Sequence, residues 1–575
     1  MRSNQKIFTV LGMLIVFLVI SLRYMWIDPN LYQLRDDGII TLSHAKNWVD
    51  YGFIGINPSG GKVEGTSAPL QFLIYSGVYL FTGMGYAAFG QIMTAICTLL
   101  MGLSIALLFK DRKHVSLAFS FLFATFLSFQ SSFIEWHGSG MENSITHALF
   151  LLTVVGFASM LWNEKIDYRW LIVVFLASIS RIDSIFHLFP VWVLFGLFWW
   201  FLQKNTKGFL LIAYAMVAWA TLHFCRFLYF GDWLPNTAYA QDISISHRLM
   251  DLIHLKSSAI EQFKFLSKQI YFSHGGHWLL FLIFLPFVDW KKKYSPLIVF
   301  SSSMIITALI YPAFFGPSRL DYSRTNTHMA VFVFVLIVSI LLCLKKDSMK
   351  LTYMTFGIVI GFFIYTKTQI DPYYLCCDIN GFDKTHAQFK QIATQEGIQR
   401  PTVANPDLGI MSWYKDMNIV DLGMIGTPFL ARTKNPKTIS NFIFDHVAPD
   451  LIESHEIWSC LHYNTIFMDP RFKANYLVVK EDFIRHGDSC GGKALPTGIW
   501  IRRDILKNSN SRERKLHDAL TQSIDLSKIE DELKLCKENR NCGYVIRSVY
   551  RVLPEIKING QYDQLVKIFP EIKFF

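Results

Sequence analysis

Long apolar runs separated by short polar segments occupy residues 1–368. Several of these runs reach about 18 residues or more, the length that a helix needs to cross the hydrocarbon core of a bilayer. The pattern predicts about eleven transmembrane helices, so the expected fold class is a polytopic α-helical membrane protein. The predicted spans lie near residues 7–27, 87–109, 114–132, 141–162, 169–183, 184–202, 208–230, 276–290, 295–315, 327–345 and 350–367.

Two apolar segments need a separate interpretation. Residues 68–81 are too short to span comfortably at about 1.5 Å per residue, and counting them as a span would move the next basic cluster to the other side of the membrane. We therefore expect a juxtamembrane helix that lies against the outer leaflet. The first run, residues 7–27, is long and has no convincing small-x-small cleavage site, so we interpret it as an uncleaved anchor.

The pattern changes after residue 368. The segment RPTVANPDLGIMSWYKDMNIVDLG predicts strand, short helix and strand, and ANYLVVKED and TGIWIRRD predict further strands. From Ser509 onward the chain is charged and is predicted to be helical. We expect a transmembrane domain at 1–368, including a first outer loop at 28–86, and a mixed α/β soluble domain at 369–575, which is long enough to bury its own core.

Composition supports the membrane class, and the charge distribution orients it. Charged residues make up 17% of the chain and hydrophobic residues 52%, whereas soluble proteins carry about 25% charged residues. The net charge of +11 would suit a nucleic-acid-binding protein, but short basic clusters between apolar runs are typical of cytoplasmic loops. We therefore expect no nucleic-acid partner, an outer C-terminal domain, and cytoplasmic clusters at 110–113, 165–169, 204–207, 291–293 and 345–346.

The nine cysteines divide between the two regions. Those in or beside apolar runs are expected to be inert small hydrophobic residues: Cys97, Cys225 and Cys343. The other six predict disulfides in an oxidising compartment, with a connectivity that the sequence leaves open: Cys376, Cys377, Cys460, Cys490, Cys536 and Cys542.

Two adjacent carboxylates, Asp36 and Asp37, begin the first outer loop, directly before the helically spaced residues IITLSHAKNWV. One Asp suits a helix N-cap, because its side chain accepts hydrogen bonds from the first turn and complements the helix dipole. A second Asp beside it repels the first and raises a pKa. The pair is therefore a candidate site as well as a candidate cap.

The remaining unusual polar motifs all fall on the predicted outer side: EWHGSGMEN at 135–143, SRID at 180–183, FGDWLPNTAYAQD at 230–242, HGGH at 274–277 and GPSRLDYSR at 316–324. Ionisable groups at such positions often mark a site. Each also has a structural alternative: an Arg181–Asp183 ion pair that joins two helices, a turn at Asn236, or an Arg324 that reaches towards lipid headgroups. His147 and His223 are expected to be hydrogen-bonded core residues, and HGGH lacks further metal ligands.

Four motifs resemble the GT-C glycosyltransferase superfamily, in particular bacterial arabinofuranosyltransferase-like proteins of the terminal β-1,2 type. They are DDGIITLSHAKNWVDYGFIGINPSGGKVEGTSAPL at 36–70, SGMEN at 139–143, SRID at 180–183 and RFLYFGDWLPNTAYAQ at 226–241. The family usually has Pro where this chain has Ile182. Its later outer loop also differs from GPSRLDYSR.

The resemblance implies a multi-pass protein of the bacterial inner membrane that transfers a sugar, of arabinofuranosyl or similar pentosyl type, on the outer face. The donor is a polyprenyl-phosphate sugar, and the acceptor is an envelope glycan, glycolipid or protein. Asp36 is the expected base, and Asp37 orients acceptor hydroxyls or raises the pKa of the base. The expected phosphate ligands are Arg324, Arg181, His277 and Lys62. The expected sugar-binding or orienting residues are Glu142, Asp183, Asn236 and Tyr239. The resemblance implies no metal ligands and no certain cofactor, and it leaves open whether the reaction needs a divalent cation.

Two other functions remain compatible with the sequence. A transporter or flippase of lipid-linked saccharides would also carry many spans, but such proteins often show internal repeats and interrupted helices, which this pattern lacks. A non-enzymatic assembly protein that binds glycans through its outer domain is the second alternative. Loss of one envelope sugar in a deletion strain would favour the enzyme over both.

Overall fold

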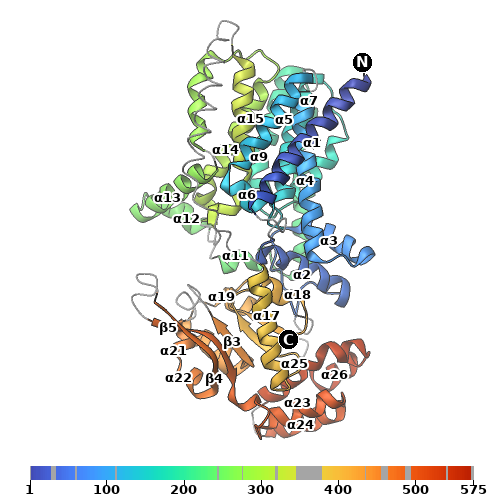
Figure 1. The fold of residues 1–575 in the computed structure, drawn as a ribbon, viewed down its shortest axis with the longest axis vertical. Helices are drawn as coiled ribbons and strands as arrows, with labels where there is room; N and C mark the ends of the chain where they lie inside the picture. Colours follow the sequence, from blue (N-terminus) through green and yellow to red (C-terminus); the bar gives the residue numbers. More distant parts are fainter. Residues whose placement is uncertain are drawn as a thin grey trace.

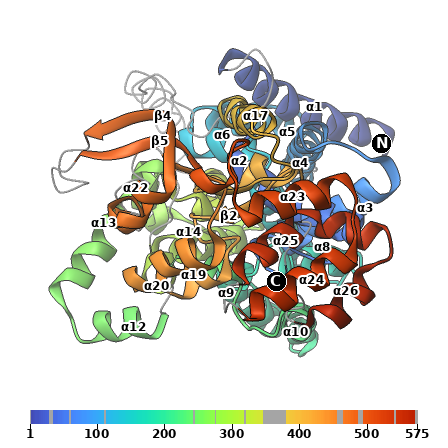
Figure 2. The same ribbon diagram turned by 90° about the horizontal axis from the view of Figure 1, so that it is seen from below.

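The computed structural model describes residues 2–27, 34–57, 61–109, 113–241, 245–274, 276–316, 321–344, 379–433, 435–454, 464–485, 494–538 and 542–570. A bundle of long helices forms one half of the molecule, and a mixed domain of helices and one sheet forms the other half (Figure 1). The view from below shows the C-terminal domain covering the end of the bundle (Figure 2).

The N-terminal half is helical throughout its regular elements. Its helices are α1 (Arg2–Ile27), α2 (Asp36–Tyr51), α3 (Pro69–Thr82), α4 (Tyr86–Leu108), α5 (Lys113–Ser128), α6 (Ser131–His137), α7 (Asn143–Asn163), α8 (Trp170–Ser178), α9 (Ser184–Gln203), α10 (Lys207–Phe230), α11 (Asn236–Ala240), α12 (Ile245–Ile253), α13 (Ser257–Ser273), η1 (Gly276–Phe287), α14 (Ser295–Phe315), η2 (Asp321–Asn326) and α15 (His328–Cys343). In the described residues, seven helices are long and apolar enough to cross a membrane.

The structure supports most of the predicted spans and differs at specific ones. The seven candidate helices include α1, α4, α7, α9, α10 and α14, and the last runs from Arg324 to Cys343. The predicted span at 114–132 is α5, which meets α6 at a bend of 89°. Helix α8 has nine residues, about 14 Å at the usual rise, which is too short to cross a bilayer. The 12-residue η1 is not among the candidates either, and residues 350–367 lie outside the described residues.

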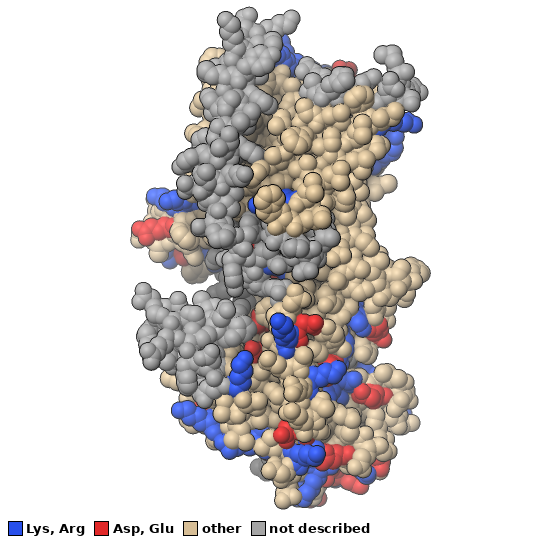
Figure 3. All heavy atoms as spheres, viewed as in Figure 1, with Lys and Arg blue, Asp and Glu red and all other residues tan. Residues whose placement is uncertain are grey.

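The basic segment at 291–293 lies beside the last turns of α7 and α15, at the end of the bundle away from the C-terminal domain. The indole of Trp162 donates to the carbonyl of Lys293, whose ammonium lies 4.6 Å from the Trp162 ring centroid. The amide of Asp289 donates to the carbonyl of Cys343 at 2.7 Å. We call the opposite end of the bundle the domain-facing end. The space-filling view shows mostly uncharged bundle surface, with charges gathered over the C-terminal half (Figure 3).

The first outer loop packs against the C-terminal domain rather than standing alone. Helices α2 and α3 contribute Ile39, Ile40 and Phe72 to one apolar cluster, together with Leu408 and Ile410 of the C-terminal domain. The opposite side of α3 exposes three large apolar side chains: Leu73, Leu80 and Phe81. The separate helix predicted at 68–81 is therefore confirmed, and its place against the outer leaflet stays a prediction.

The C-terminal domain is built on a five-stranded sheet with strand order β2-β1-β3-β5-β4. The strands are β1 (Thr402–Asn405), β2 (Asn418–Asp421), β3 (Leu451–Ser454), β4 (Tyr476–Arg485) and β5 (Ala494–Arg502). Strand β1 pairs in parallel with β2 and β3, whereas β5 pairs antiparallel with β3 and β4. The expected strand, helix and strand at 400–423 and the two later strands are therefore confirmed, while β3 is an additional strand.

The remaining elements of this domain are α17 (Ile379–Gln395), α18 (Gly409–Trp413), α19 (Pro428–Arg432), α20 (Pro436–Asn441), the π-helix η4 (Phe442–Val447), α21 (Asn464–Met468), α22 (Pro470–Asn475), η7 (Arg503–Ile505), α23 (Arg512–Gln522), α24 (Leu526–Glu538), α25 (Gly543–Ile558) and α26 (Tyr562–Ile568). Helices α23 to α26 confirm the expected helical tail, and their apolar faces form one buried cluster.

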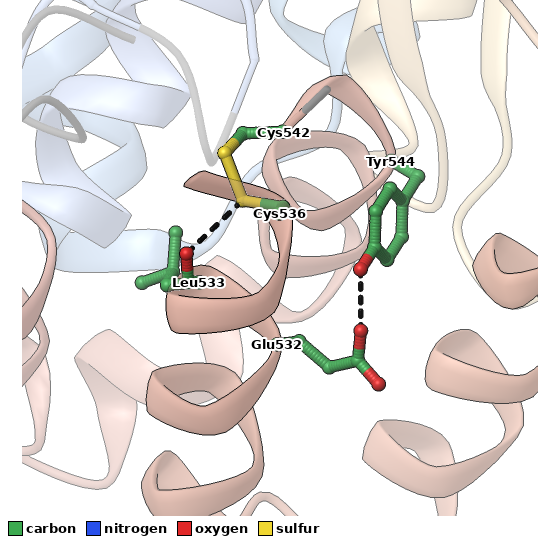
Figure 4. Close-up of a disulfide and its surroundings, with 5 residues drawn as sticks. All are labelled: Glu532, Leu533, Cys536, Cys542 and Tyr544. Atoms are coloured by element: carbon green, nitrogen blue, oxygen red, sulfur yellow. Dashed lines mark hydrogen bonds between the residues drawn. A yellow bond between two sulfur atoms is a disulfide. The ribbon is translucent and has the colours of Figure 1, made fainter. Parts of the chain in front are cut away.

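One of the predicted disulfides joins α24 to the start of α25. Cys536 and Cys542 are bonded, and Tyr544 donates to the carboxylate of Glu532 beside them (Figure 4). Among the described residues, the free cysteines are Cys97, Cys225 and Cys343, as the sequence predicts. Cys376, Cys377, Cys460 and Cys490 lie outside the described residues.

A buried ionic network attaches the sheet to the tail helices. Asp450, which precedes β3, accepts from Arg551 at 2.6 Å and from Arg502 at 3.1 Å. Glu513 of α23 accepts from Arg502, Arg551 and Arg547 at 2.6, 2.8 and 2.6 Å. We refer to these five residues as the Arg551 network.

Candidate functional site

A cluster of ionisable side chains lies at the domain-facing end of the bundle, in the turns where its helices begin and end. Arg181, between α8 and α9, donates to Asp183 at 2.7 Å and pairs with Glu142, the residue before α7. Tyr311 of α14 donates to Asp183 at 2.7 Å. The fifth member, Arg324, lies 3.9 Å from the Glu142 carboxylate. We call these five residues the Arg181 cluster, and four of them are predicted site residues.

Arg181 and Asp183 hold each other in their charged forms. Burial alone would raise the pKa of Asp183, but the adjacent guanidinium of Arg181 outweighs burial and holds that pKa well below its usual range. Burial likewise opposes the charge of Arg181, and the carboxylates of Asp183 and Glu142 overcome it. The predicted alternative of an ion pair that joins two helices is thus a real contact, and a third helix shares it.

Arg324 is held much less completely than Arg181. Its Nη1 lies 3.6 Å from the sulfur of Met141, and its Nε has no hydrogen-bond partner among the described residues. The side chain keeps 15% of its surface exposed. Buried or half-buried guanidinium groups normally use their donors, so Arg324 retains binding capacity for an anion.

Asp36 has a role that its local sequence does not show. Arg35 occupies the N-cap position of α2, and no side chain caps this helix. The Asp36 carboxylate instead accepts hydrogen bonds from the backbone of α18, from Gly409 N at 2.9 Å and Ile410 N at 2.7 Å. A Cβ on Gly409 would overlap the Asp36 carbonyl oxygen, so this close approach requires glycine. The expectation that Asp36 caps its own helix is therefore corrected: it caps α18, 373 residues away.

Burial raises the pKa of Asp36 to about 7. The two backbone hydrogen bonds oppose this shift, while the charge of Asp37 adds to it. The predicted like-charge effect of Asp37 is therefore present, although burial is the larger cause. A carboxyl with this pKa is partly deprotonated near neutral pH, which suits a general base.

A second buried contact holds the C-terminal domain against α2. Lys415, which follows α18, donates to Ser43 Oγ at 2.9 Å and to the carbonyl of Ile56 at 3.0 Å. Burial holds the pKa of this amine well below its usual value, and the nearby charge of Lys46 adds to the effect. Neither Lys415 nor α18 carries a motif that would identify it from the sequence.

The carboxylate pair and the Arg181 cluster are joined by the segment that precedes α7. The amide of Arg35 donates to the carbonyl of Ser139 at 2.9 Å, and a Cβ on Gly38 would lie 2.9 Å from the same oxygen. Gly38 therefore permits the close approach of α2 to this segment. Two and three residues later, Met141 and Glu142 contact Arg324.

The other two motifs are tied to the same region. Ile182 N donates to the carbonyl of Ser67 at 3.1 Å. Glu64, which lies in the first motif, forms a buried two-bond ion pair with Arg226 at 2.5 Å. Each of the four motifs behind the family resemblance thus contacts at least one of the others. Glu64 and Arg226 both lie in these motifs, but the sequence alone indicates no role for either.

Asn236 and Tyr239 contact the C-terminal domain rather than the Arg181 cluster. The Asn236 side chain donates to the carbonyls of Met424 and Ile425 at 2.9 and 2.5 Å. Tyr239 donates to Asp232 at 2.8 Å, and the Arg432 guanidinium lies 4.4 Å from its ring centroid. These contacts favour a role in domain attachment over their expected role in sugar binding.

Of the other two expected phosphate ligands, the structure describes only the side chain of Lys62. Lys62 is exposed, and its ammonium lies 4.2 Å from the centroid of the Tyr229 ring. His277 lies in η1, and its side chain is outside the described ones. Among the described residues, no group of three or more His, Cys, Asp or Glu side chains is arranged to hold a metal ion.

Tyr311 and His187 are neighbours of the site that were not predicted from the sequence, whereas His147 was predicted to be a core residue. Tyr311 ends an apolar run, which gives no sign of its bond to Asp183. The ring of His187 stacks on Tyr311 at 5.4 Å between centroids. His147 is a buried, hydrogen-bonded residue, as expected, with Thr327 at 2.8 Å and His137 at 3.0 Å.

No family model matches the chain, and neither a curated protein nor a solved structure matches it. Function is therefore inferred from the residues and contacts of the site itself.

Proposed function

We propose that the protein is an inverting glycosyltransferase of the GT-C type, which moves a sugar from a polyprenyl-phosphate donor to an envelope acceptor on the outer face of the membrane. The observation that carries this proposal is the convergence of the four motif segments at the domain-facing end of the bundle. A pentosyl donor of the arabinofuranosyl kind is the finer part of the proposal and rests on the family resemblance alone.

Arg324 is the group best placed to bind the donor phosphate. A departing lipid phosphate carries its own negative charge and needs cationic stabilisation more than protonation. Arg324 keeps an unpartnered Nε among the described residues and lies 3.9 Å from the Glu142 carboxylate, so a phosphate would find free donors there. Arg181 is committed to two carboxylates and acts by fixing Glu142 between the two guanidinium groups.

Asp36 supplies the base in this proposal. An oxygen of the acceptor hydroxyl bonds to the anomeric carbon while its proton passes to the Asp36 carboxylate, and the bond from carbon to phosphate oxygen breaks with its electron pair on the phosphate. The pKa of about 7 suits this step. Each carboxylate oxygen keeps a second lone pair beside its backbone bond from α18, but Asp36 is 4% exposed, so the acceptor hydroxyl reaches it when α18 moves.

The test compares three single variants of the purified full-length protein in lipid nanodiscs, with a labelled polyprenyl-phosphate pentose as donor. Asp36→Asn is expected to abolish transfer. It also places an amide N–H₂ against one of the two backbone N–H groups, so docking of the C-terminal domain must be measured in parallel by limited proteolysis. A purified, docked and fully active Asp36→Asn protein would overturn the assignment of the base.

Gly409→Ala separates the two roles of Asp36. Its Cβ would displace α18 from α2 while leaving the carboxylate in place, so transfer should persist, at a changed rate, while docking weakens. Asp37→Asn, the neighbouring charge-matched variant, should keep docking intact. Movement of lipid-linked sugar across liposomes without any product would instead favour a flippase.

A further inference from the structure

A cavity of about 350 Å³ lies in the C-terminal domain, away from the Arg181 cluster. Its walls come from α17, α23, α25 and the two loops that lead into β1 and β2. Figure 1 shows the tail helices at the end of the molecule farthest from the bundle. The size falls within the range of small-molecule sites, roughly 300–1,000 Å³.

Three hydrogen-bonding groups from three of these elements have no partner among the described residues. They are Nε of Arg400, Oγ1 of Thr521 and Nη1 of Arg551, and all three residues line the cavity. Arg551 is 2% exposed. Each buried donor without a partner costs about 1–3 kcal/mol, and native proteins leave few of them. Three at one cavity indicate that something else satisfies them.

The unused groups are mainly donors, whereas the acidic groups of the cavity are already engaged. Glu555 accepts from Arg400 Nη1 at 2.8 Å, and Asp416 accepts from His386 and Lys390 at 2.8 and 3.2 Å. The cavity therefore offers two guanidinium edges and one hydroxyl to an incoming acceptor. Guanidinium groups match the geometry of carboxylates and phosphates.

The backbone at the cavity is held in an unusual conformation. Arg400 has φ +44°, and Lys415, the residue before Asp416, has φ +59°. Non-glycine residues in the left-handed region carry strain that is found more often at binding sites than elsewhere. The rest of the lining is apolar, with Met417, Leu520 and Val552, so the ligand needs a compact uncharged part beside its charged group.

We propose that this cavity binds a small ligand that carries an anionic oxygen group, a carboxylate or a phosphate, through Arg400, Arg551 and Thr521. The site does not depend on the transfer reaction, because its residues lie outside the Arg181 cluster and binding needs no donor. An acidic sugar unit of an acceptor and a free acidic metabolite share this chemistry.

The experiment is isothermal titration of the purified full-length protein in nanodiscs with three probes: inorganic phosphate, glucuronate and glucose. We expect saturable binding of phosphate or glucuronate and none of glucose. Glucuronate binding much tighter than phosphate would identify a carboxylated sugar, and the reverse would identify a phosphorylated ligand. Absence of saturable binding of both anions, or equal binding of glucose, would overturn the proposal.

Variants locate the binding. Arg400→Gln should weaken the anion about tenfold or more, since hydrogen bonds to charged groups contribute roughly 1.5–3 kcal/mol. Thr521→Val is nearly isosteric and should weaken it by about fivefold. Arg471→Gln removes one positive charge from the same domain outside the cavity and should leave affinity within about twofold.

Lys390→Gln is a second cavity variant for the case that Arg400→Gln does not fold. The Lys390 side chain is 64% exposed, so its replacement should not affect folding. Its loss should weaken the anion by a smaller factor than the loss of Arg400 and leave thermal unfolding unchanged. Wild-type affinity in Arg400→Gln, Thr521→Val and Lys390→Gln would show that the anion binds outside this cavity and would overturn the assignment.

Discussion

The Arg181 cluster and the Arg551 network are both buried groups of arginine and carboxylate side chains, but they are anchored differently. In the Arg551 network, Asp450 and Glu513 each accept from two or three guanidinium groups, mostly at 2.6–3.1 Å. In the Arg181 cluster, Arg181 is bonded in the same way, while Arg324 stays 3.9 Å from its carboxylate.

The position of each group in the fold explains this difference. The Arg551 network joins the sheet to two tail helices that contribute to one apolar cluster, so its two carboxylates are each held by several guanidinium groups, while Nη1 of Arg551 has no partner among the described residues on the side of the cavity. The Arg181 cluster consists of residues in turns and at helix ends, where Glu142, Arg181 and Asp183 precede their helices. Carboxylates that are fully bonded support the fold, whereas a guanidinium left partly satisfied, as in Arg324 and on one edge of Arg551, is available to a ligand.

The largest effect on stability is expected from Asp450→Asn. This change removes one of the two buried carboxylates that Arg551 and Arg502 share, leaving only Glu513, and breaking a buried pair in this way costs about 3–5 kcal/mol. Pulse proteolysis of the full-length protein across a urea series, following cleavage within residues 379–570, would measure the loss. Asp518→Asn, at a residue whose side chain is 48% exposed and pairs with Arg514, is the control and should cost less than about 1 kcal/mol.

Arg324→Lys should have the opposite profile from Asp450→Asn. It keeps the charge but loses the planar fork that binds phosphate, so we expect transfer to fall by about 10²–10³-fold, the usual effect of losing one transition-state donor. Thermal unfolding should stay unchanged. Arg181→Lys breaks the bonds to Glu142 and Asp183, so it should lower both the transfer rate and the thermal stability. Equal loss of stability in the two variants would remove the distinction between the two arginines.

The pH dependence of Asp36 separates base catalysis from docking. Its pKa is about 7 in the fold and 3.8 for an unperturbed Asp, so the folded state binds more protons between these values. Docking stability should therefore be greatest below about pH 4 and fall as the pH rises to 7. Catalysis needs the deprotonated carboxylate, so the rate of transfer should rise as the pH increases through about 7, the pKa of Asp36.

Transfer rates and protease resistance, each measured between about pH 5 and 9, would show these opposite trends. Asp37→Asn removes a charge that raises the Asp36 pKa, so the acid limb of the rate should shift to lower pH. A rate that does not vary with pH in the wild type would remove Asp36 as the base.

Local patterns predicted those parts of the fold that depend on local physics. Apolar run length located α4, α7 and α14, and alternating apolar residues located β4 and β5, because these elements bury one face or a whole surface. Strand β3, Leu451–Ser454, was not predicted, although it has four residues like β1 and β2; it is defined by its pairing between β1 and β5 in the folded sheet.

Contacts between distant residues could not be predicted in this way. Asp36 has the sequence context of a cap for its own helix, and only the docked C-terminal domain reveals that α18 receives its hydrogen bonds. Asn236 and Tyr239 similarly lie in a motif of the bundle but contact Met424 and Arg432. The polar motifs on the predicted outer side identified four candidate site residues: Glu142, Arg181, Asp183 and Arg324. Tyr311 could be identified only from the packing of α14 against Asp183.

The smallest expected effect comes from the periphery of the Arg551 network. The Cys536–Cys542 disulfide closes a loop with a sequence separation of six residues between α24 and α25, and a loop this short restricts the unfolded chain by only about 2 kcal/mol. A Cys536→Ser, Cys542→Ser double variant should expose α24 to proteases first while Arg551, on the inner side of α25, keeps its two carboxylates. Anion binding at the cavity should then persist. If the double variant lost stability as Asp450→Asn does, the disulfide rather than the ionic network would be the main attachment of the tail helices to the sheet.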